Sequence, residues 1–368
     1  MDEDLKLEVL LRLMEERRAS DIHLQVGSQP IFRIKGDIER LTEFPVLEEA
    51  LLRKMIYGVL KEKEIKVFEE SGNYDTARGF PGSGRFRLNV FLQRGTIALV
   101  ARRISSTVPN FETLNLPPSI AKIADFPNGL VLVTGATGSG KSSTLAALIN
   151  HINRLRKCHI LCIEDPIEYL YQNELAIINQ REVGIDVMSF RDALKYAVRE
   201  DPDVILVGEI RDRDTIEFGL HGAETGHLVF GTLHSSNATQ TISRVLNFFP
   251  QSEHPSIRRS LSLQLMAIVS QLLLPSCNET LHRVPACEVM FNNPIVKRLI
   301  MDGSDEKLPR AIKSGKGEGM QDFEQALYEL VGKEFITEET AIEYAENPHS
   351  LQMKLRGIFL SDEGGIIT

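Results

Sequence analysis

The sequence has few cysteines, no long apolar segment and no excess of basic charge. Its four cysteines include no C-x-x-C pair, so it predicts neither a disulfide framework nor a zinc site, and a reducing compartment fits. No stretch approaches the roughly 20 consecutive apolar residues that cross a bilayer. The 42 basic and 51 acidic residues give a net charge of −9, which disfavours nucleic acid as the main partner. We expect a protein that reaches a membrane only through another protein.

Composition and periodicity divide the 368 residues into four parts. An amphipathic helical pattern over Leu5–Met14 and alternating runs such as Arg85–Phe91 predict a small α+β domain. A segment punctuated by prolines follows and predicts a linker. Short apolar runs between helical segments then predict an α/β core with a parallel sheet, and helical spacing predominates beyond it. The expected parts are residues 1–105, 106–118, 119–249 and 250–368.

The expected strands of the core are continuous apolar runs, which are typical of strands buried on both faces. They are Leu130–Thr134, Ile160–Ile163, Val204–Val207 and Leu228–Phe230. In the last part, apolar residues three or four apart predict helices, at Ile257, Leu261, Leu265 and Ile268.

The strongest motif lies directly after the first of these runs and fits the phosphate loop G-x-x-x-x-G-K-[ST]. Its residues are Gly135, Ala136, Thr137, Gly138, Ser139, Gly140, Lys141 and Ser142, and Ser143 completes the set that we assign to nucleotide binding. The glycines let backbone N–H groups turn toward phosphates, Lys141 reaches the outer phosphates, and the Ser142 hydroxyl can bind Mg²⁺. The motif predicts ATP and Mg²⁺ as cofactors.

A phosphate loop needs carboxylates nearby, to hold the metal and to orient the attacking water. Glu209 ends one apolar run and is our candidate metal ligand, with Gly208 where phosphate-loop proteins usually carry an aspartate. Another run ends in an acidic cluster that contains Glu164, Asp165 and Glu168. The clustering favours catalytic carboxylates over a solvated loop.

Two histidines flank another strand, His227 before it and His234 after it. A metal site built from side chains alone is disfavoured, because Gly226 interrupts the segment. A histidine at a strand end beside the γ-phosphate is better interpreted as a sensor or a hydrogen-bond donor, with a purely structural histidine as the alternative.

The phosphate loop, the acidic cluster and the two histidines, together with Gly208–Asp212, resemble the type II/type IV secretion ATPase superfamily. Ala19–Leu24 and Asn179–Gly184 resemble its branch of PilT/PilU-like type IV pilus retraction ATPases. The resemblance implies an N-terminal PAS-like α+β domain and a RecA-like ATPase domain with a C-terminal helical extension. It also implies a homohexamer with ATP between subunits.

The resemblance further implies the roles of individual residues. Glu168 would activate water, with Glu164 as the competing assignment, and Glu209 would be the atypical Walker B acid. Arginines of the small domain would act across the subunit boundary, and the candidates are Arg85, Arg87, Arg102 and Arg103. The implied setting is the inner face of the cytoplasmic membrane, where the motor acts on a PilC-like platform protein and disassembles the pilus in twitching motility.

Retraction is favoured over extension because the chain lacks both a four-cysteine zinc element and the length for an additional domain. Residues Pro294–Ile300 depart from the Ala-Ile-Arg-Asn-Leu-Ile segment of PilT-type motors. That difference leaves open an accessory ATPase that depends on a paralogous partner motor. A type II secretion or DNA-uptake ATPase and a nucleic-acid motor are further alternatives.

Overall fold

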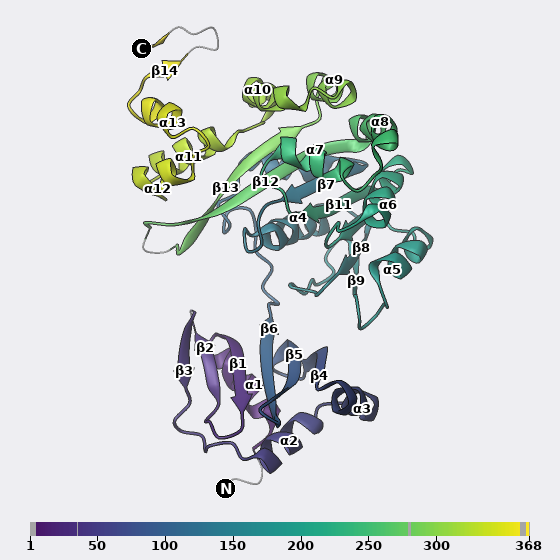
Figure 1. Cartoon of the computed structure of the whole chain (residues 1–368), viewed down its shortest axis with the longest axis vertical. Helices are drawn as coiled ribbons and strands as arrows, with labels where there is room; N and C mark the ends of the chain where they lie inside the picture. The colour runs from purple at the N-terminus through teal and green to yellow at the C-terminus, as the bar shows by residue number, and fades with distance from the viewer. Residues whose placement is uncertain (1–4, 35, 279–280, 361–365, 368) are drawn as a thin grey trace. The chain divides into compact units, whose positions relative to one another are not determined.

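The structure is a computed structural model that describes residues 5–34, 36–278, 281–360 and 366–367. Contacts divide the chain into two compact units, which are described separately below (Figure 1). The N-terminal unit comprises the residues up to Thr107 together with Glu168–Leu170, and the second unit comprises Val108–Ile167 and the residues from Tyr171 onward. Within the described ranges, no helix is both long and apolar enough to cross a membrane.

The N-terminal unit is an antiparallel sheet of six strands in the order β3-β2-β1-β6-β5-β4. Its strands are β1 (Ala19–Gln25), β2 (Ile31–Ile34), β3 (Asp37–Arg40), β4 (Asn73–Phe80), β5 (Gly84–Gln93) and β6 (Thr96–Ile104). The helices are α1 (Leu7–Glu16), α2 (Glu49–Tyr57) and α3 (Glu62–Ser71). The expected alternation is confirmed on β5, where Phe86, Leu88 and Val90 are all fully buried. The unit is the predicted α+β domain.

The second unit is built on a sheet of seven strands in the order β13-β12-β7-β11-β10-β8-β9, in which only β13 is antiparallel to its neighbour. The strands are β7 (Gly129–Thr134), β8 (His159–Glu164), β9 (Ile177–Glu182), β10 (Val204–Val207), β11 (Leu228–Leu233), β12 (Leu265–Pro275) and β13 (Arg283–Phe291). All four apolar runs expected to be buried strands are strands, so that prediction is confirmed.

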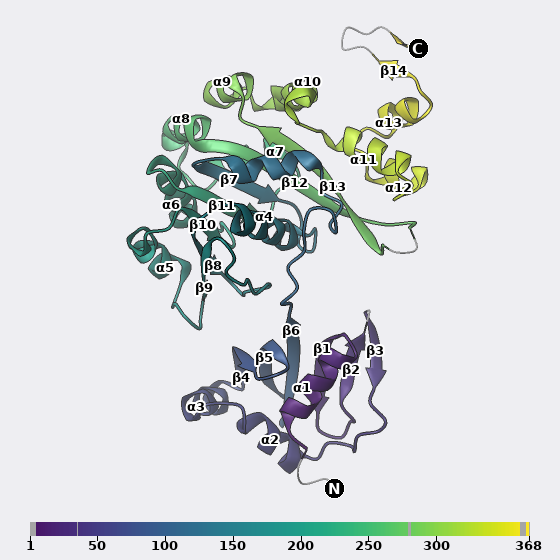
Figure 2. The same cartoon turned by 180° about the vertical axis from the view of Figure 1, so that it is seen from behind.

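Helices cover both faces of this sheet (Figures 1 and 2). Leu130 and Leu132 of β7 pack in one core, whereas Val131 and Val133 pack in the other, as the twofold alternation of a strand requires. The helices are α4 (Lys141–Leu155), α5 (Phe190–Ala197), α6 (Arg213–Glu224), α7 (Ala238–Leu246), α8 (His254–Gln264), α9 (Pro294–Asp302) and α10 (Leu308–Ser314), with short 3-10 turns η1 (Pro118–Asp125), η2 (Val198–Glu200), η3 (Gln251–Glu253), η4 (Asp305–Lys307) and η5 (Gly315–Glu318). The doubly covered, mostly parallel sheet matches the predicted ATPase fold.

The prediction of a predominantly helical region after residue 249 is wrong in one respect. Helix α8 ends at Gln264, and the chain then forms β12 and β13, which extend the core sheet. The helical spacing through Leu265 and Ile268 therefore crosses from a helix into a strand. Helices predominate only after β13, with α11 (Phe323–Gly332), α12 (Glu338–Tyr344) and α13 (Pro348–Leu355) around a small core that they share with the ends of β12 and β13. The strands β14 (Phe359–Leu360) and β15 (Ile366–Ile367) follow.

Candidate nucleotide site

The phosphate loop connects the buried strand β7 to the N-terminus of α4. Gly140 is the N-cap of this helix and has a left-handed backbone, with φ of +93°. The first turn of α4 contains Lys141, Ser142 and Ser143, so its backbone N–H groups and the positive end of the helix dipole face the loop. This arrangement is a ready-made site for an anion.

Glycine is required in the loop because β12 approaches it closely. A Cβ at Gly135 would lie 2.4 Å from the carbonyl oxygen of Gln271, and φ there is +147°. A Cβ at Gly140 would lie 2.8 Å from Nε2 of Gln271. The side chain of Gln271 also accepts a buried hydrogen bond of 2.8 Å from Oγ1 of Thr144, in the first turn of α4. Gln271 thus supports the loop from the neighbouring strand.

The polar side chains of the loop are arranged to receive phosphate. Nζ of Lys141 donates to the carbonyl oxygens of Gly135 and Ala136, each at 2.9 Å. These contacts hold the ammonium group over the loop. The hydroxyl of Ser139 is buried and makes no hydrogen bond to any described residue. Since a buried hydroxyl normally has a partner, the loop has hydrogen-bonding capacity for a ligand.

The predicted acid Glu209 follows β10 and lies between the side chains of an arginine and a histidine. Its Oε2 is 2.8 Å from Nη2 of Arg211, and its Oε1 is 3.4 Å from Nε2 of His234. Nη1 of Arg211 also reaches Oδ2 of Asp165, at 3.4 Å. Hydrogen bonding to Glu209, and then the charges of Glu209 and Asp165, raise the pKa of Arg211. The structure therefore brings together carboxylates from two strand ends and one of the predicted histidines.

Glu164, at the end of β8, is on the same unit as the phosphate loop and accepts a hydrogen bond of 3.0 Å from Nε2 of Gln180. Glu168 belongs instead to the N-terminal unit. In that unit the N–H of Leu170 donates to the carbonyl oxygen of Ser105, and Tyr169 pairs with Ser105. The acidic cluster is thus divided between the two units.

The structure separates the two candidate histidines, His227 and His234, which lie at opposite ends of β11. Leu228 pairs with Gly129 at the start of β7, and Leu233 pairs with Thr134 at its end. His227 therefore lies at the opposite end of β11 from the loop, a separation of roughly 20 Å for six residues of strand. Its Nδ1 contacts the carbonyl oxygen of Gly222 at 3.0 Å. Within one chain, only His234 is at the phosphate end.

The candidate arginines of the N-terminal unit lie on β5 and β6, and two of them are paired across the strands. Arg87 is opposite Arg102, and Arg102 is opposite Asp21 on β1, which in turn is opposite Arg33 on β2. Nε of Arg102 is 2.7 Å from Oδ1 of Asp21, a carboxylate that is almost fully buried, whereas the Arg102 side chain is 71% exposed. Arg85 also lies on β5.

The row of charges formed by Arg33, Asp21, Arg102 and Arg87 carries an excess of positive charge across four strands. Like charges directly opposite one another destabilise a sheet unless something compensates them. Arg103, the fourth candidate, lies 3.7 Å from Glu15 of α1 instead. Within the row, Asp21 alone does not balance the charge of the three arginines.

Sequence reasoning missed two residues of this site. In the sequence, Arg211 appeared only within Gly208–Asp212, a segment that resembles the family. Its contacts to both Glu209 and Asp165 depend on the pairing of β8 with β10. Gln271 had no signal, because it lies 127 residues from Thr144 and in a region expected to be helical.

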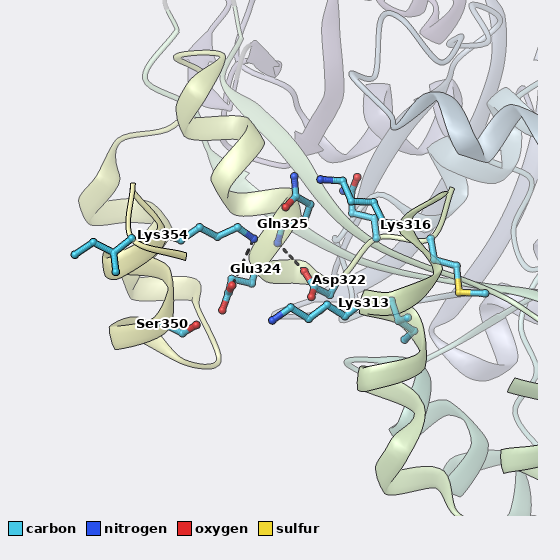
Figure 3. Close-up of a pocket in the computed structure, with 11 residues that line it drawn as sticks. Lys313, Lys316, Asp322, Glu324, Gln325, Ser350 and Lys354 are labelled. Atoms are coloured by element: carbon cyan, nitrogen blue, oxygen red, sulfur yellow. Dashed lines mark hydrogen bonds and ion pairs between the residues drawn. The ribbon is translucent and has the colours of Figure 1, made fainter. Parts of the chain in front are cut away.

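A separate cavity of about 330 Å³ lies among the C-terminal helices (Figure 3). Its charged side chains are largely paired with neighbours. Nζ of Lys354 is 3.4 Å from Glu324, and Asp322 caps α11 by accepting a 2.7 Å bond from the N–H of Gln325. None of the residues lining it belongs to the phosphate loop or to the segments that contain Glu164, Glu168 and Glu209. We do not assign nucleotide to it.

The parallel sheet, the phosphate loop and the carboxylates at neighbouring strand ends define a P-loop NTPase. Comparison with known proteins identifies the family. The model of the family "Type II/IV secretion system protein" matches residues 9–306, and the chain belongs to this family. Membership of this family, together with the ATPase relatives described next, supports ATP hydrolysis as the activity of the chain.

Three similar proteins cover nearly the whole chain. The type IV pilus retraction ATPase PilT of Pseudomonas aeruginosa is 42% identical over 341 residues, which are 93% of this chain and 98% of PilT. The type IV pilus ATPase PilU of the same organism is 40% identical over 352 residues, 96% of this chain and 92% of PilU. A crystal structure of the pilus retraction motor PilT with bound ADP has a TM-score of 0.88 and 43% identity, and it covers 95% of this chain and 99% of that one.

Proposed function

We propose that this chain is a cytoplasmic ATPase that powers type IV pilus retraction. It would act as a homohexamer at the inner face of the cytoplasmic membrane, held there by an integral platform protein. The observation that carries the proposal is the combination of an intact phosphate site with similarity to PilT along 98% of PilT's length. The family resemblance supports the ring and the platform partner.

The donor set of the loop fits ATP with Mg²⁺. The Ser142 hydroxyl and the Glu209 carboxylate are oxygen ligands of the kind that Mg²⁺ prefers, and the buried Ser139 hydroxyl has no hydrogen-bond partner among the described residues. When bound, Mg²⁺ would neutralise charge on the phosphates. Lys141 would exchange its two carbonyl contacts for phosphate oxygens, and His234 would hold Glu209 in place from the next strand end.

Two parts of the catalytic assignment involve the N-terminal unit. Glu168 is our candidate for orienting the attacking water, with Glu164 as the alternative. Arg102 and Arg87 would stabilise the charge of the transition state from a neighbouring subunit, because phosphoryl transfer requires positive charge at that point. Arg85 is the third candidate, and His227 would act from a neighbouring subunit.

The test compares wild type with Lys141→Ala, Glu209→Ala and Glu168→Ala, both as purified proteins and in a deletion strain. We expect all three variants to fold and to lose ATP turnover by at least about a hundredfold. Cells with any of them should accumulate surface pili and lose twitching motility. Wild-type turnover in either carboxylate variant would contradict the site assignment. Normal twitching with an inactive variant would contradict the retraction role.

A second candidate is an accessory ATPase that depends on a partner motor. The specific observation is α9, where Pro294–Ile300 departs from the PilT segment and Ile295 stands 58% exposed on the surface of the unit. ATP turnover measured with and without a co-expressed paralogue separates the two candidates. Stimulation of at least about tenfold by the paralogue would favour the accessory role.

A further inference from the structure

Glu288, on β13, is a carboxylate enclosed between β12 and the start of α7. It is only 6% exposed. Its Oε1 accepts a hydrogen bond of 2.7 Å from the backbone N–H of Ala238 and one of 3.4 Å from Oγ of Ser270. Oγ1 of Thr134 in turn donates to Oγ of Ser270, at 3.1 Å. Two donors therefore converge on one carboxylate oxygen, and Thr134 reaches it through the hydroxyl of Ser270.

The two ends of this series of hydrogen bonds adjoin the nucleotide site. Thr134 directly precedes the phosphate loop, and Ala238 is the first residue of α7, which begins four residues after His234. Ser235, which follows His234, is buried, and its hydroxyl is hydrogen-bonded to the hydroxyl of Thr241 on α7, at 2.8 Å. A shift of the N-terminus of α7 would therefore carry the segment after β11 with it.

We propose that Glu288 is a positioning residue for ATP hydrolysis, whose carboxylate keeps the start of α7, and with it His234, in register with the phosphate loop. Glu288 acts through Ala238 and through Ser270, not by contact with the nucleotide. The proposal rests on the assignment of the phosphate loop and His234 to the hydrolytic site.

The surroundings of Glu288 make this link sensitive to pH. Burial is the first cause and the acidic neighbours Glu346 and Asp322 contribute further, so that the pKa of Glu288 rises to about 7. Of these two acids, Glu346 lies between α12 and α13, and Asp322 caps α11. The partners of Glu288 on the other elements carry no charged side chain: Ser270 on β12 and the backbone N–H at the start of α7. Above that pH the carboxylate is ionised, and its bonds are charge-assisted and stronger. Below it, protonation weakens them.

The substitution Glu288→Gln keeps the shape and the acceptor oxygen and removes the charge. We expect the ratio of wild-type to variant kcat to rise with pH around an apparent pKa of about 7, as the bonds to the wild-type carboxylate strengthen. The ratio should approach one near about pH 6 and reach about ten near about pH 8.5, while KM for ATP changes less than about twofold. Titrating groups common to both proteins cancel in the ratio.

Stability should move in the opposite direction from activity. Because the folded protein raises the pKa of this acid, ionisation of Glu288 disfavours the folded state as pH rises from the pKa of the unfolded chain through about 7. Glu288→Gln removes that cost, so we expect its melting temperature at about pH 8 to equal or exceed that of wild type. A loss of kcat in this variant is then not a loss of fold.

A double-mutant cycle with Ser270→Ala tests the chain of bonds itself. If both residues act through one chain, the double variant should have a kcat within about twofold of the weaker single variant. Ser262→Ala is the matched control, since Ser262 is a fully buried serine on α8 that donates to the carbonyl oxygen of Arg259. It should retain wild-type kcat.

A flat ratio of kcat across the pH range, or losses that multiply in the double variant, would overturn the positioning role. Wild-type protein that binds ATP without turnover at any pH would overturn the hydrolytic assignment itself, and the role of Glu288 with it. Superimposable pH profiles with full wild-type turnover would overturn only the role of Glu288.

Discussion

Gly208 occupies the place where two strand ends approach each other most closely in this site. A Cβ there would lie 3.2 Å from Cα of Glu164 and 3.2 Å from the carbonyl oxygen of Ile163. Both contacts are backbone atoms of the adjacent strand, and the N–H of Gly208 donates to that same carbonyl at 2.8 Å. An aspartate, usual at this position in phosphate-loop proteins, would be crowded here by the backbone of β8. The acidic role therefore passes to the next residue, Glu209.

We expect Gly208→Ala to push β10 and β8 apart at the site. The added methyl group should lower the free energy of unfolding by about 1–3 kcal/mol and reduce kcat by at least about tenfold. Denaturant unfolding and steady-state ATP turnover check this. Gly332→Ala is the control, because a Cβ at that position of α11 meets no atom within 4 Å, and it should leave kcat unchanged without lowering the free energy of unfolding.

At the level of residues, the sequence could predict the groups whose spacing is local. The phosphate loop and Glu209 each stand in a recognisable run of neighbours, directly after a buried strand. The bridging role of Arg211 and the support from Gln271 could not be predicted, because both depend on which strands lie side by side. His227 shows the converse, since the six residues of β11 place it far from His234 although the two are near in sequence.

At the level of elements, β12 was mistaken for helix because its pattern is ambiguous. Apolar residues spaced by three or four continue from α8 into Leu265 and Ile268, and an apolar run of this length suits either structure. The outcome is decided by pairing with β7, which offers an unfilled edge of the parallel sheet, and with β13. Tertiary pairing of this kind overrides local periodicity.

The pairing of β12 with β7 also places Gln271 against the phosphate loop, and its support of the loop can be tested through its hydrogen bond with Thr144. Thr144→Val leaves Oε1 of Gln271 buried without this donor, and Gln271→Met leaves the Thr144 hydroxyl without its acceptor. Each should cost about 1–3 kcal/mol of stability and weaken ADP binding by about tenfold. Calorimetric titration with ADP and denaturant unfolding measure the two effects.

The double variant Thr144→Val/Gln271→Met supplies the internal control for this pair. With both partners apolar, no buried polar group of the pair is stranded, so its loss of stability should be smaller than the sum of the single losses. Additive losses would show that the hydrogen bond between α4 and β12 does not support the loop.

At the level of the whole molecule, the net charge of −9 makes the cationic row on the N-terminal unit stand out. Arg102 is largely exposed although Asp21 binds it, and the Arg87–Asp75 contact is long, at 3.6 Å. Such loosely neutralised arginines suit a site that is completed by an anion from elsewhere. In a ring of subunits that anion would be the nucleotide of a neighbour.

Mixing two inactive variants decides whether these arginines act within one subunit or between two. Lys141→Ala removes the phosphate site, and Arg102→Lys keeps a positive charge beside Asp21 while losing the planar guanidinium that binds phosphate oxygens in pairs. Each variant alone should have little ATP turnover. If the arginine acts on the neighbouring subunit, a co-expressed equal mixture restores roughly one competent interface in four.

Action within one subunit would give no recovery at any mixing ratio, because no single chain would then carry both intact groups. The same mixture made with Arg87→Ala assigns the second arginine of the row, and its loss strands no buried charge because Asp75 is itself half exposed. Arg12→Ala, at an exposed position of α1 outside the row, is the control. By itself it should have wild-type turnover, and mixed with Lys141→Ala it should show only the activity of the intact phosphate loops that the Arg12→Ala chains contribute. Recovery with Arg102→Lys beyond its own residual turnover thus requires an active site shared between two subunits, which is the arrangement a ring motor needs to couple hydrolysis to relative motion of its subunits.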